Sequence, residues 1–253
     1  MKLDFTDKRV LVTGGTRGIG RAVVEAFLEC GARVAVNGST AESTARAVAE
    51  LDAGDRVVAA PGSVAEVEGC RAIAAVALEG LGGLDVLVNN AGFSRGKPIE
   101  EFREEIWDQV IDTNLKGTFY MTQMTVAALR ESKGAIVNFS SVFGLVGAPG
   151  GLAYSSAKAG IVNLTRSLAL ALAPDVRVNA ICPGGVDTDM LRALAVKIAG
   201  DVEKGYEILS QDAAQKRIAH PREIAGPVLY LASDLASFVT GSIHVVDGGE
   251  TID

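Results

Sequence analysis

Apolar positions along the chain form short runs that alternate with longer segments of helical periodicity. The runs predict seven strands, at Val10–Val12, Arg33–Asn37, Arg56–Ala60, Val86–Val88, Ala135–Phe139, Val176–Ile181 and Ser242–Val246. Strands and helices that alternate along a whole chain are typical of a parallel sheet with right-handed crossovers. We therefore expect an α/β fold with three α/β/α layers around a seven-stranded parallel sheet.

Glycine and possible capping residues mark the first helix boundaries. A helix is predicted from about Gly18 to Cys30, and Gly31 follows where a glycine commonly ends a helix. The next two helices are preceded by Ser39-x-x-Glu42 and Ser63-x-x-Glu66, which have the spacing of capping boxes. These serines act either as helix caps or as contacts to a ligand.

Two later helices carry more apolar residues than one buried face requires. Helical patterns extend from Ile99 to about Glu131, with a break near residues 114–117, and from Ala153 to Ala173, where Pro174 stops the helix. Their apolar side chains are spread around the helix axis: Phe119, Tyr120, Met121, Met124, Val126, Leu129, Ile161, Val162, Leu164, Leu168, Leu170 and Leu172. One face of each helix is expected to pack on the sheet and another on a partner subunit.

The longest irregular stretch lies between Pro183 and His220. It contains a mixed helical segment, Leu191–Ile198, and a charged part, Asp201–Lys204, which together favour a mobile loop over a substrate, around residues 185–219. No linker or repeat interrupts the strand and helix pattern. We expect one domain over residues 1–253.

Composition narrows the possible partners. The chain has 253 residues, a mass of 26.2 kDa and a formal net charge of −7, which argues against a nucleic-acid or anionic-membrane surface. No apolar run approaches a membrane span, and the segment Met1–Phe5 lacks the apolar core of a signal peptide, so we expect no membrane partner and a cytoplasmic location.

Cysteine and histidine give no metal-binding pattern. The three cysteines are far apart and lack C-x-x-C spacing, which indicates reduced thiols. His220 and His244 are the only histidines, and each is expected to be structural. We therefore expect no metal site.

The first strand ends in the glycine-rich segment Thr13-Gly14-Gly15-Thr16-Arg17-Gly18-Ile19-Gly20. Glycines permit a sharp turn and expose the first N–H groups of the next helix to a pyrophosphate. The spacing is not G-x-G-x-x-G, so this segment alone is equally consistent with an ordinary strand-to-helix turn.

Several further motifs follow in order. The fourth strand runs into Asn89-Asn90-Ala91-Gly92 at the edge where ligands bind in open α/β sheets. Tyr154 and Lys158 are one helical turn apart, a spacing that also arises as a solvated pair, and Ser141 lies thirteen positions before Tyr154 (154 − 141). Together with Thr13-Gly14-x-x-x-Gly18-x-Gly20, these motifs resemble the short-chain dehydrogenase/reductase family from Lys8 to about Gly249, and the likeness extends to its 3-oxoacyl-carrier-protein reductases.

The resemblance implies a Rossmann-like fold, a homotetramer and the catalytic residues Asn114, Ser141, Tyr154 and Lys158. Hydride reduction of a ketone requires a proton donor, and Tyr154 is the candidate, with the Lys158 cation lowering its high pKa. In the family the serine holds the substrate oxygen, a role for Ser141 with Ser140 as competitor. Asn114 would support a water that leads to the lysine, or is simply a helix irregularity.

The resemblance also implies the contacts to a dinucleotide. These are Gly14, Thr16, Arg17, Gly18, Ile19, Gly20, Gly38, Ser39, Ser63, Val64, Asn90, Ala91, Gly92, Tyr154, Lys158, Pro183, Gly184, Val186 and Thr188. Ser63 departs from the acid or amide often found at its position in the family. Thr188 would meet the nicotinamide carboxamide or, alternatively, only cap a helix.

The region after the second strand favours NADP(H). An acid there would bond the 2′-OH of NAD and repel the 2′-phosphate of NADP, but no acid precedes Glu42, and Arg17 could reach a phosphate. Arg17 could equally be a solvated surface residue, and NAD(H) remains possible.

The expected activity is NADP(H)-dependent interconversion of a ketone and a secondary alcohol, with a small carbonyl or alcohol as substrate. The alternatives are an NAD-dependent alcohol, sugar or steroid dehydrogenase and a non-catalytic nucleotide sensor, although a sensor would not need Ser141, Tyr154 and Lys158. Apolar residues that line a substrate pocket or belong to the core are Phe93, Val142, Phe143, Val146, Val186, Leu191 and Leu194.

Overall fold

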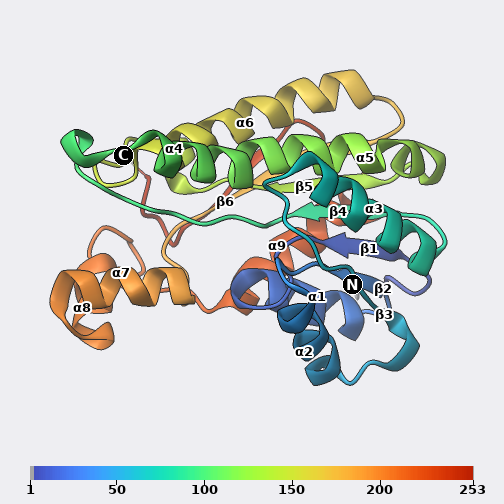
Figure 1. The fold of residues 1–253 in the computed structure, drawn as a ribbon, viewed down its shortest axis with the longest axis horizontal. Coiled ribbons are helices and arrows are strands. Elements are labelled where there is room, and N and C mark those ends of the chain that lie inside the picture. The colour runs from blue at the N-terminus through green and yellow to red at the C-terminus, as the bar shows by residue number, and fades with distance from the viewer. Residues whose placement is uncertain (1–2, 253) are drawn as a thin grey trace.

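The strands form one parallel seven-stranded sheet, as predicted. The computed structural model describes residues 3–252; Met1, Lys2 and Asp253, including the start of the Met1–Phe5 segment, lie outside it. The strands are β1 (Arg9–Val12), β2 (Arg33–Val36), β3 (Val57–Ala59), β4 (Val86–Asn89), β5 (Ala135–Phe139), β6 (Arg177–Pro183) and β7 (Ile243–Val246). Their order across the sheet is β3-β2-β1-β4-β5-β6-β7, so the direction of winding changes between β1 and β4 (Figure 1).

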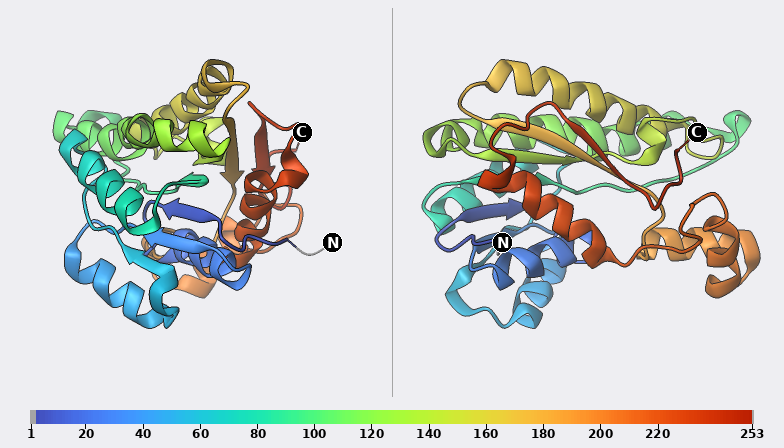
Figure 2. Two further views of the ribbon diagram at one scale, coloured as in Figure 1. Left: turned by 90° about the vertical axis from the view of Figure 1, so that its right-hand side faces the viewer. Right: turned by 180° about the vertical axis from the view of Figure 1, so that it is seen from behind.

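Helices cover both faces of the sheet (Figure 2). They are α1 (Gly18–Glu29), α2 (Ala41–Leu51), α3 (Val67–Leu81), α4 (Glu104–Ile111), α5 (Gly117–Ser132), α6 (Leu152–Leu172), α7 (Asp189–Ala199), α8 (Val202–Leu209) and α9 (Pro221–Ala232). Apolar residues of α1 and α9 join one buried cluster, and those of α3, α5 and α6 join the other.

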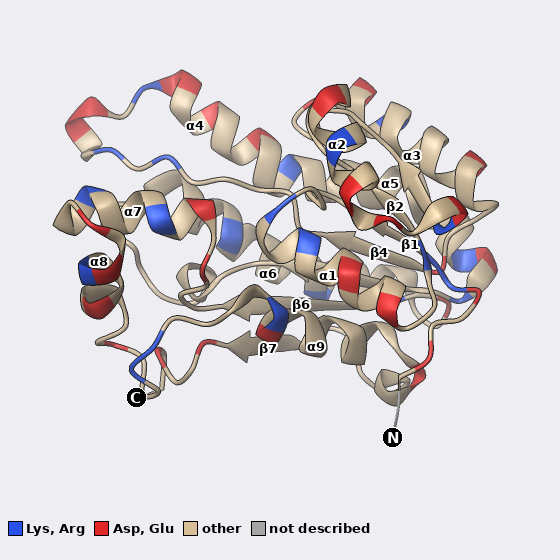
Figure 3. Ribbon diagram, turned by 90° about the horizontal axis from the view of Figure 1, so that it is seen from below, with Lys and Arg blue, Asp and Glu red and all other residues tan. Residues whose placement is uncertain are grey.

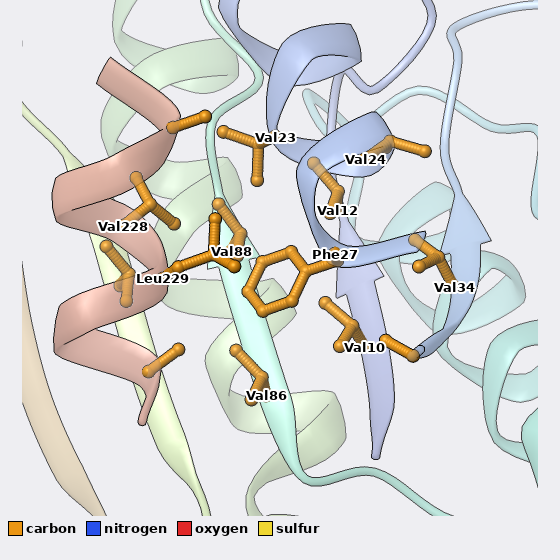
Figure 4. Packing of buried hydrophobic residues seen from close by; sticks show 14 of the residues in the cluster. Val10, Val12, Val23, Val24, Phe27, Val34, Val86, Val88, Val228 and Leu229 are labelled. Carbon is orange, nitrogen blue, oxygen red and sulfur yellow. The ribbon is translucent and has the colours of Figure 1, made fainter. Parts of the chain in front are cut away.

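The two clusters follow the alternation of side chains along each strand. Val10 and Val12 point toward α1 and α9, where Phe27 fills the space between helix and sheet (Figure 4), whereas Leu11 belongs to the opposite cluster. Both faces of the sheet are therefore buried. Replacing a large core side chain by a small one, as in Phe27→Ala, would lower the free energy of unfolding by about 3–5 kcal/mol.

The predicted capping boxes at Ser39 and Ser63 are wrong. Thr40 caps α2, because its Oγ1 accepts a hydrogen bond from the Ser43 N–H at 3.2 Å, and α3 begins after Glu66 without a side-chain cap. Ser63 Oγ instead accepts the Ala65 N–H at 3.3 Å within the preceding turn. Both serines have the right spacing, but the helices start one residue or more later than the pattern indicates.

The break in the long helical pattern is a π-helix. Residues 99–101 form a separate 3₁₀ turn, and α4 then continues through the π-helical segment Asp112–Lys116 into α5. Asn114 lies in the middle of this segment and is completely buried. Single π-turns inside α-helices are frequent at functional sites.

Residues 185–219 are more regular than expected. The charged part Asp201–Lys204 is not a loop but the start of α8, where Asp201 accepts the Lys204 N–H at 3.0 Å, and α7 packs against α8. The helices α7 and α8 lie beyond the carboxyl ends of the strands (Figure 1). The segments that lead into and out of these two helices are hydrogen-bonded to each other, because the Asp187 N–H donates to the Ala219 carbonyl. The charged residues at its start, Asp201, Glu203 and Lys204, are exposed, which made the charge pattern resemble that of a loop.

Basic and acidic positions are interspersed over the fold rather than gathered by sign (Figure 3). Within residues 3–252, no helix combines the length and apolarity that a bilayer crossing demands.

Candidate active site

Asn90 joins the glycine-rich turn of β1 to the end of β4. Its backbone N–H and that of Ala91 both donate to Thr13 Oγ1 at 3.0 Å, and its Nδ2 donates to the carbonyls of Thr13 and Gly14. The Asn-Asn-Ala-Gly segment therefore holds the glycine turn in place at the point where the sheet changes its winding direction.

The turn itself leaves helix N–H groups available. Gly14 and Gly18 have φ values of 63° and 56°, which side chains disfavour, and Arg17 at the N-cap of α1 gives no side-chain cap. Uncapped N–H groups at a helix N-terminus attract an anion. Arg17 is exposed and pairs with the exposed Asp189 at 3.3 Å.

The end of β2 contains a buried amide that the motifs did not indicate. Asn37 Oδ1 accepts the Gly14 N–H at 3.2 Å, and its Nδ2 donates to the Ala60 carbonyl at 2.9 Å. A polar residue ending an otherwise apolar strand was the available signal.

Gly38, the next residue, has no room for a side chain. A Cβ there would lie 2.5 Å from Thr44 Oγ1 and 2.6 Å from Thr16 Cγ2. Ser39 is exposed, whereas Val64 on the neighbouring connection is buried. Gly38, Ser39 and Val64 all follow neighbouring strands at their carboxyl ends. Of these three residues, Ser39 alone has an exposed side chain.

Ser141 rather than Ser140 faces Tyr154. Ser141 follows β5, accepts the Phe143 N–H at 3.2 Å, and is hydrogen-bonded to the Tyr154 hydroxyl. Ser140 Oγ donates to the Lys158 carbonyl at 2.8 Å and is thereby committed to the backbone of α6. The geometry distinguishes the two serines that the sequence left in competition.

Lys158 is buried beside Tyr154. Its Nζ lies 5.4 Å from the centroid of the Tyr154 ring and donates to the Phe139 carbonyl at 2.8 Å, and the residue is only 3% exposed. Burial lowers the pKa of Lys158 to about 8. Burial raises the pKa of Tyr154 to about 12, against the opposing effect of Ser141, so the phenol is protonated at neutral pH. The expected lowering of this pKa by Lys158 is therefore wrong for the protein without ligand.

Asn114 and Gly92 complete this region. Asn114 Nδ2 donates to the carbonyls of Phe93 and Val110, both at 2.9 Å, while its buried Oδ1 has no partner among the described residues. A Cβ at Gly92 would collide with that Oδ1 and lie 3.4 Å from Lys158 Nζ. The absence of a side chain at Gly92 therefore lets an unpaired acceptor, Asn114 Oδ1, approach its backbone, with the Lys158 cation nearby.

The chain beyond β6 passes the same edge of the sheet. Pro183 is buried at the end of the strand, Gly184 follows, and Glu250 Oε2 accepts the Gly185 N–H at 3.2 Å. Thr188 caps α7 by accepting the Leu191 N–H at 3.4 Å, and its methyl group approaches Gly18.

The apolar candidates divide into core and surface. Val142 and Val186 are buried core residues, whereas Phe143, Val146 and Leu194 are exposed, and Phe93 and Leu191 are half-buried. Thr16 and Ile19 are half-buried in the glycine turn, and Gly20 is buried against the Gly14 carbonyl.

A bonded cluster within residues 185–219 was missed by sequence reasoning. Arg192 donates to both carboxylate oxygens of Asp187, at 2.7 and 2.8 Å, and the Tyr206 hydroxyl donates to Asp187 at 2.7 Å. These bonds hold the pKa of Asp187 below its usual value. Across residues 3–252, no group of three metal-ligating side chains comes together.

Comparison with known proteins identifies the family. The family model described as enoyl-(acyl carrier protein) reductase matches residues 14–251. A probable galactose dehydrogenase from Rhizobium meliloti is 40% identical over 97% of this chain and 96% of its own length. A 3-oxoacyl-[acyl-carrier-protein] reductase from Staphylococcus aureus is also 40% identical, over 96% of this chain and 97% of its own length.

A solved structure agrees with these relatives. The structure titled short-chain dehydrogenase/reductase and glucose/ribitol dehydrogenase, from Brucella melitensis, superposes with a TM-score of 0.92 at 32% identity and covers both chains completely. Fold, family model and relatives thus agree, and the chain belongs to the short-chain dehydrogenase/reductase family of oxidoreductases.

Proposed function

We propose that the protein is an NADP(H)-dependent oxidoreductase that interconverts a ketone and a secondary alcohol. The observation that carries this proposal is the contact of Ser141 with the Tyr154 hydroxyl, next to a buried Lys158. A protonated phenol that a serine orients is suited to give a proton to a carbonyl oxygen, while a bound nicotinamide supplies the hydride.

Each residue has a distinct task in this proposal. Ser141 binds and orients the substrate oxygen, and Tyr154 donates the proton to it in reduction or accepts it in oxidation. The Lys158 ammonium stabilises negative charge on the Tyr154 oxygen after that transfer. The unpaired Oδ1 of Asn114 and the remaining Lys158 donors are assigned to a ribose hydroxyl or to a water that returns the proton.

The glycine turn is suited to hold the pyrophosphate of the dinucleotide, because its helix N–H groups are uncapped. We assign the remaining contacts predicted from the family to the same ligand, with Pro183, Gly184, Val186 and Thr188 at the nicotinamide end. The turn after β2 has no acid before Glu42, which favours NADP(H) over NAD(H).

A second candidate is NAD-dependent oxidation of an alcohol or sugar. It is favoured by the ion pair of Arg17 with Asp189, which occupies the one arginine of the glycine turn that could meet a 2′-phosphate. An exposed pair of this kind is worth less than about 1 kcal/mol, so a phosphate can displace it.

The experiment is reduction of a ketone panel with NADPH and with NADH. The proposal predicts turnover of at least one ketone and a higher kcat/KM with NADPH. Absence of turnover with both cofactors, alongside measurable cofactor binding, would favour a nucleotide sensor instead.

We further propose a cytoplasmic homotetramer with a single domain in which residues 185–219 close over the substrate. Leu170 on α6 is 84% exposed and Phe119 on α5 is 40% exposed, so both helices present apolar surface that a second copy could cover. Light scattering at micromolar concentration should give four times the chain mass, and a monomer would contradict the assembly.

A further inference from the structure

The segment between the catalytic serine and tyrosine carries no hydrogen-bonding side chain. Residues 142–153 read Val-Phe-Gly-Leu-Val-Gly-Ala-Pro-Gly-Gly-Leu-Ala. Three of the apolar side chains are exposed, Phe143 at 38%, Leu145 at 41% and Val146 at 47%. A substrate bound at Ser141 therefore meets apolar surface on this side.

The chain that leaves β6 presents a second apolar surface. Since β5 and β6 are adjacent and parallel, the segments after Ser141 and after Pro183 leave the sheet at the same edge. Met190, Leu194 and Ile198 are spaced by four along α7, which places them on one side of the helix, and all three are at least 40% exposed.

Two polar side chains just before this stripe, Asp187 and Thr188, are already bonded within the protein. Asp187 is bonded to Arg192 and Tyr206. Thr188 is occupied by the backbone of Val186 and Leu191.

A sugar needs several side chains that bond its hydroxyls, because a hydroxyl taken from water without a partner costs free energy. An alkyl chain needs only apolar surface. Both segments present apolar side chains, so we infer that this enzyme prefers carbonyl substrates with an aliphatic chain over aldoses, with the turn 142–146 and the α7 stripe Met190–Leu194–Ile198 as specificity-determining surfaces. This inference rests on the proposed function, and it sets the chain apart from the sugar dehydrogenases that two of its relatives are named as.

The test is kcat/KM for a series of straight-chain methyl ketones, from butanone to nonanone, beside oxidation of galactose and glucose. We expect kcat/KM to rise with each methylene, by at most about fourfold, which corresponds to about 0.8 kcal/mol. Aldose oxidation should fall at least about 100-fold below oxidation of the best aliphatic alcohol. A kcat/KM that does not change with ketone chain length, or aldose oxidation as efficient as that of aliphatic alcohols, would overturn the inference.

Matched variants locate the effect. Leu194→Ser should flatten the rise of kcat/KM with chain length. Val196→Ser, on the same helix but two positions along and on another side, should keep the full rise. An equal loss in both variants would contradict the role of the stripe. If butanone and every longer ketone are inert in the wild type, the proposed function itself fails, which distinguishes the two failures.

Discussion

The residues assigned to catalysis and those assigned to specificity differ in how firmly the fold holds them. Ser141, Lys158 and Asn114 are buried at strand ends or inside helices and bonded to the backbone. The glycine turn, the end of β2 and residues 185–219 contribute exposed groups, such as Arg17, Ser39 and Leu194. Under the proposed function, the residues that need a fixed geometry lie in the core. The residues proposed to select cofactor and substrate are exposed and can be replaced without unfolding the sheet.

The largest expected effect comes from the buried region. Tyr154→Phe removes the proton donor and almost no volume, so reduction should fall by about 10²- to 10⁴-fold while cofactor affinity stays nearly constant. Steady-state kinetics and cofactor titration by fluorescence would measure the two quantities. Lys158→Met should lower both, and a Tyr154→Phe enzyme with near wild-type kcat would refute the assigned role.

The pH dependence follows from Lys158. Its pKa is lowered to about 8 by burial, so the ammonium is present below that pH and is lost as the pH rises through it. The value of kcat/KM for NADPH, which reports the free enzyme, should therefore be constant at lower pH and decline above about 8. Lys158→Arg should move the decline to higher pH, because a guanidinium keeps its proton. An unchanged profile would contradict this assignment.

Substitutions in the exposed region should have smaller effects, and they should change cofactor specificity rather than the turnover rate. Ser39→Asp adds a carboxylate at an exposed position, and two unit charges about 4 Å apart interact by about 1 kcal/mol in water and about 4 kcal/mol near a protein surface. We expect kcat/KM for NADPH to fall about tenfold or more relative to that for NADH.

Gly38 provides the steric control for that change. Gly38→Asp brings a charge to the turn directly after β2, but its Cβ would press on Thr16 and Thr44. Gly38→Ala imposes the same crowding without charge. A shift in cofactor preference in Gly38→Asp alone supports electrostatic selection, and an equal shift in both would show that crowding decides it.

The bonded cluster within residues 185–219 is expected to have a smaller effect. Asp187→Asn keeps the shape but weakens the bonds to Arg192 and Tyr206. KM for the ketone should rise a few-fold with kcat nearly unchanged, and Tyr206→Phe, which removes only one bond, should do less. A kcat loss as large as that of Tyr154→Phe would place Asp187 with the catalytic residues instead.

Metal removal should have the smallest effect. The described residues bring no group of three metal ligands together, so dialysis against EDTA is expected to leave kcat unchanged. Loss of activity that zinc or magnesium restores would overturn this expectation.

The same contrast explains what sequence could predict. The strands could be predicted from their apolar runs. Site residues such as Ser141 and Tyr154 could be predicted from motifs whose residue types the proposed chemistry requires. Sequence did not separate Ser140 from Ser141, because only the packing of α6 shows which hydroxyl is bonded to the Lys158 carbonyl.

Local patterns were less informative where neighbouring residues have similar capping ability or hydrophobicity. Thr40 caps α2 in place of its neighbour Ser39, and the charges of residues 201–204 did not reveal that Asp201 caps a helix. Val142 and Phe143 are neighbours of similar hydrophobicity, yet one is core and the other exposed, which depends on a turn that periodicity does not define.

The most direct test of the central claim is transfer of deuterium from the nicotinamide C4 of labelled NADPH to a ketone. Mass spectrometry of the alcohol should show one deuterium on the carbinol carbon per turnover in the wild type, and no labelled alcohol above background in Tyr154→Phe. Alcohol that forms without the label, or labelled product at the wild-type rate in the variant, would contradict hydride reduction with Tyr154 as the proton donor.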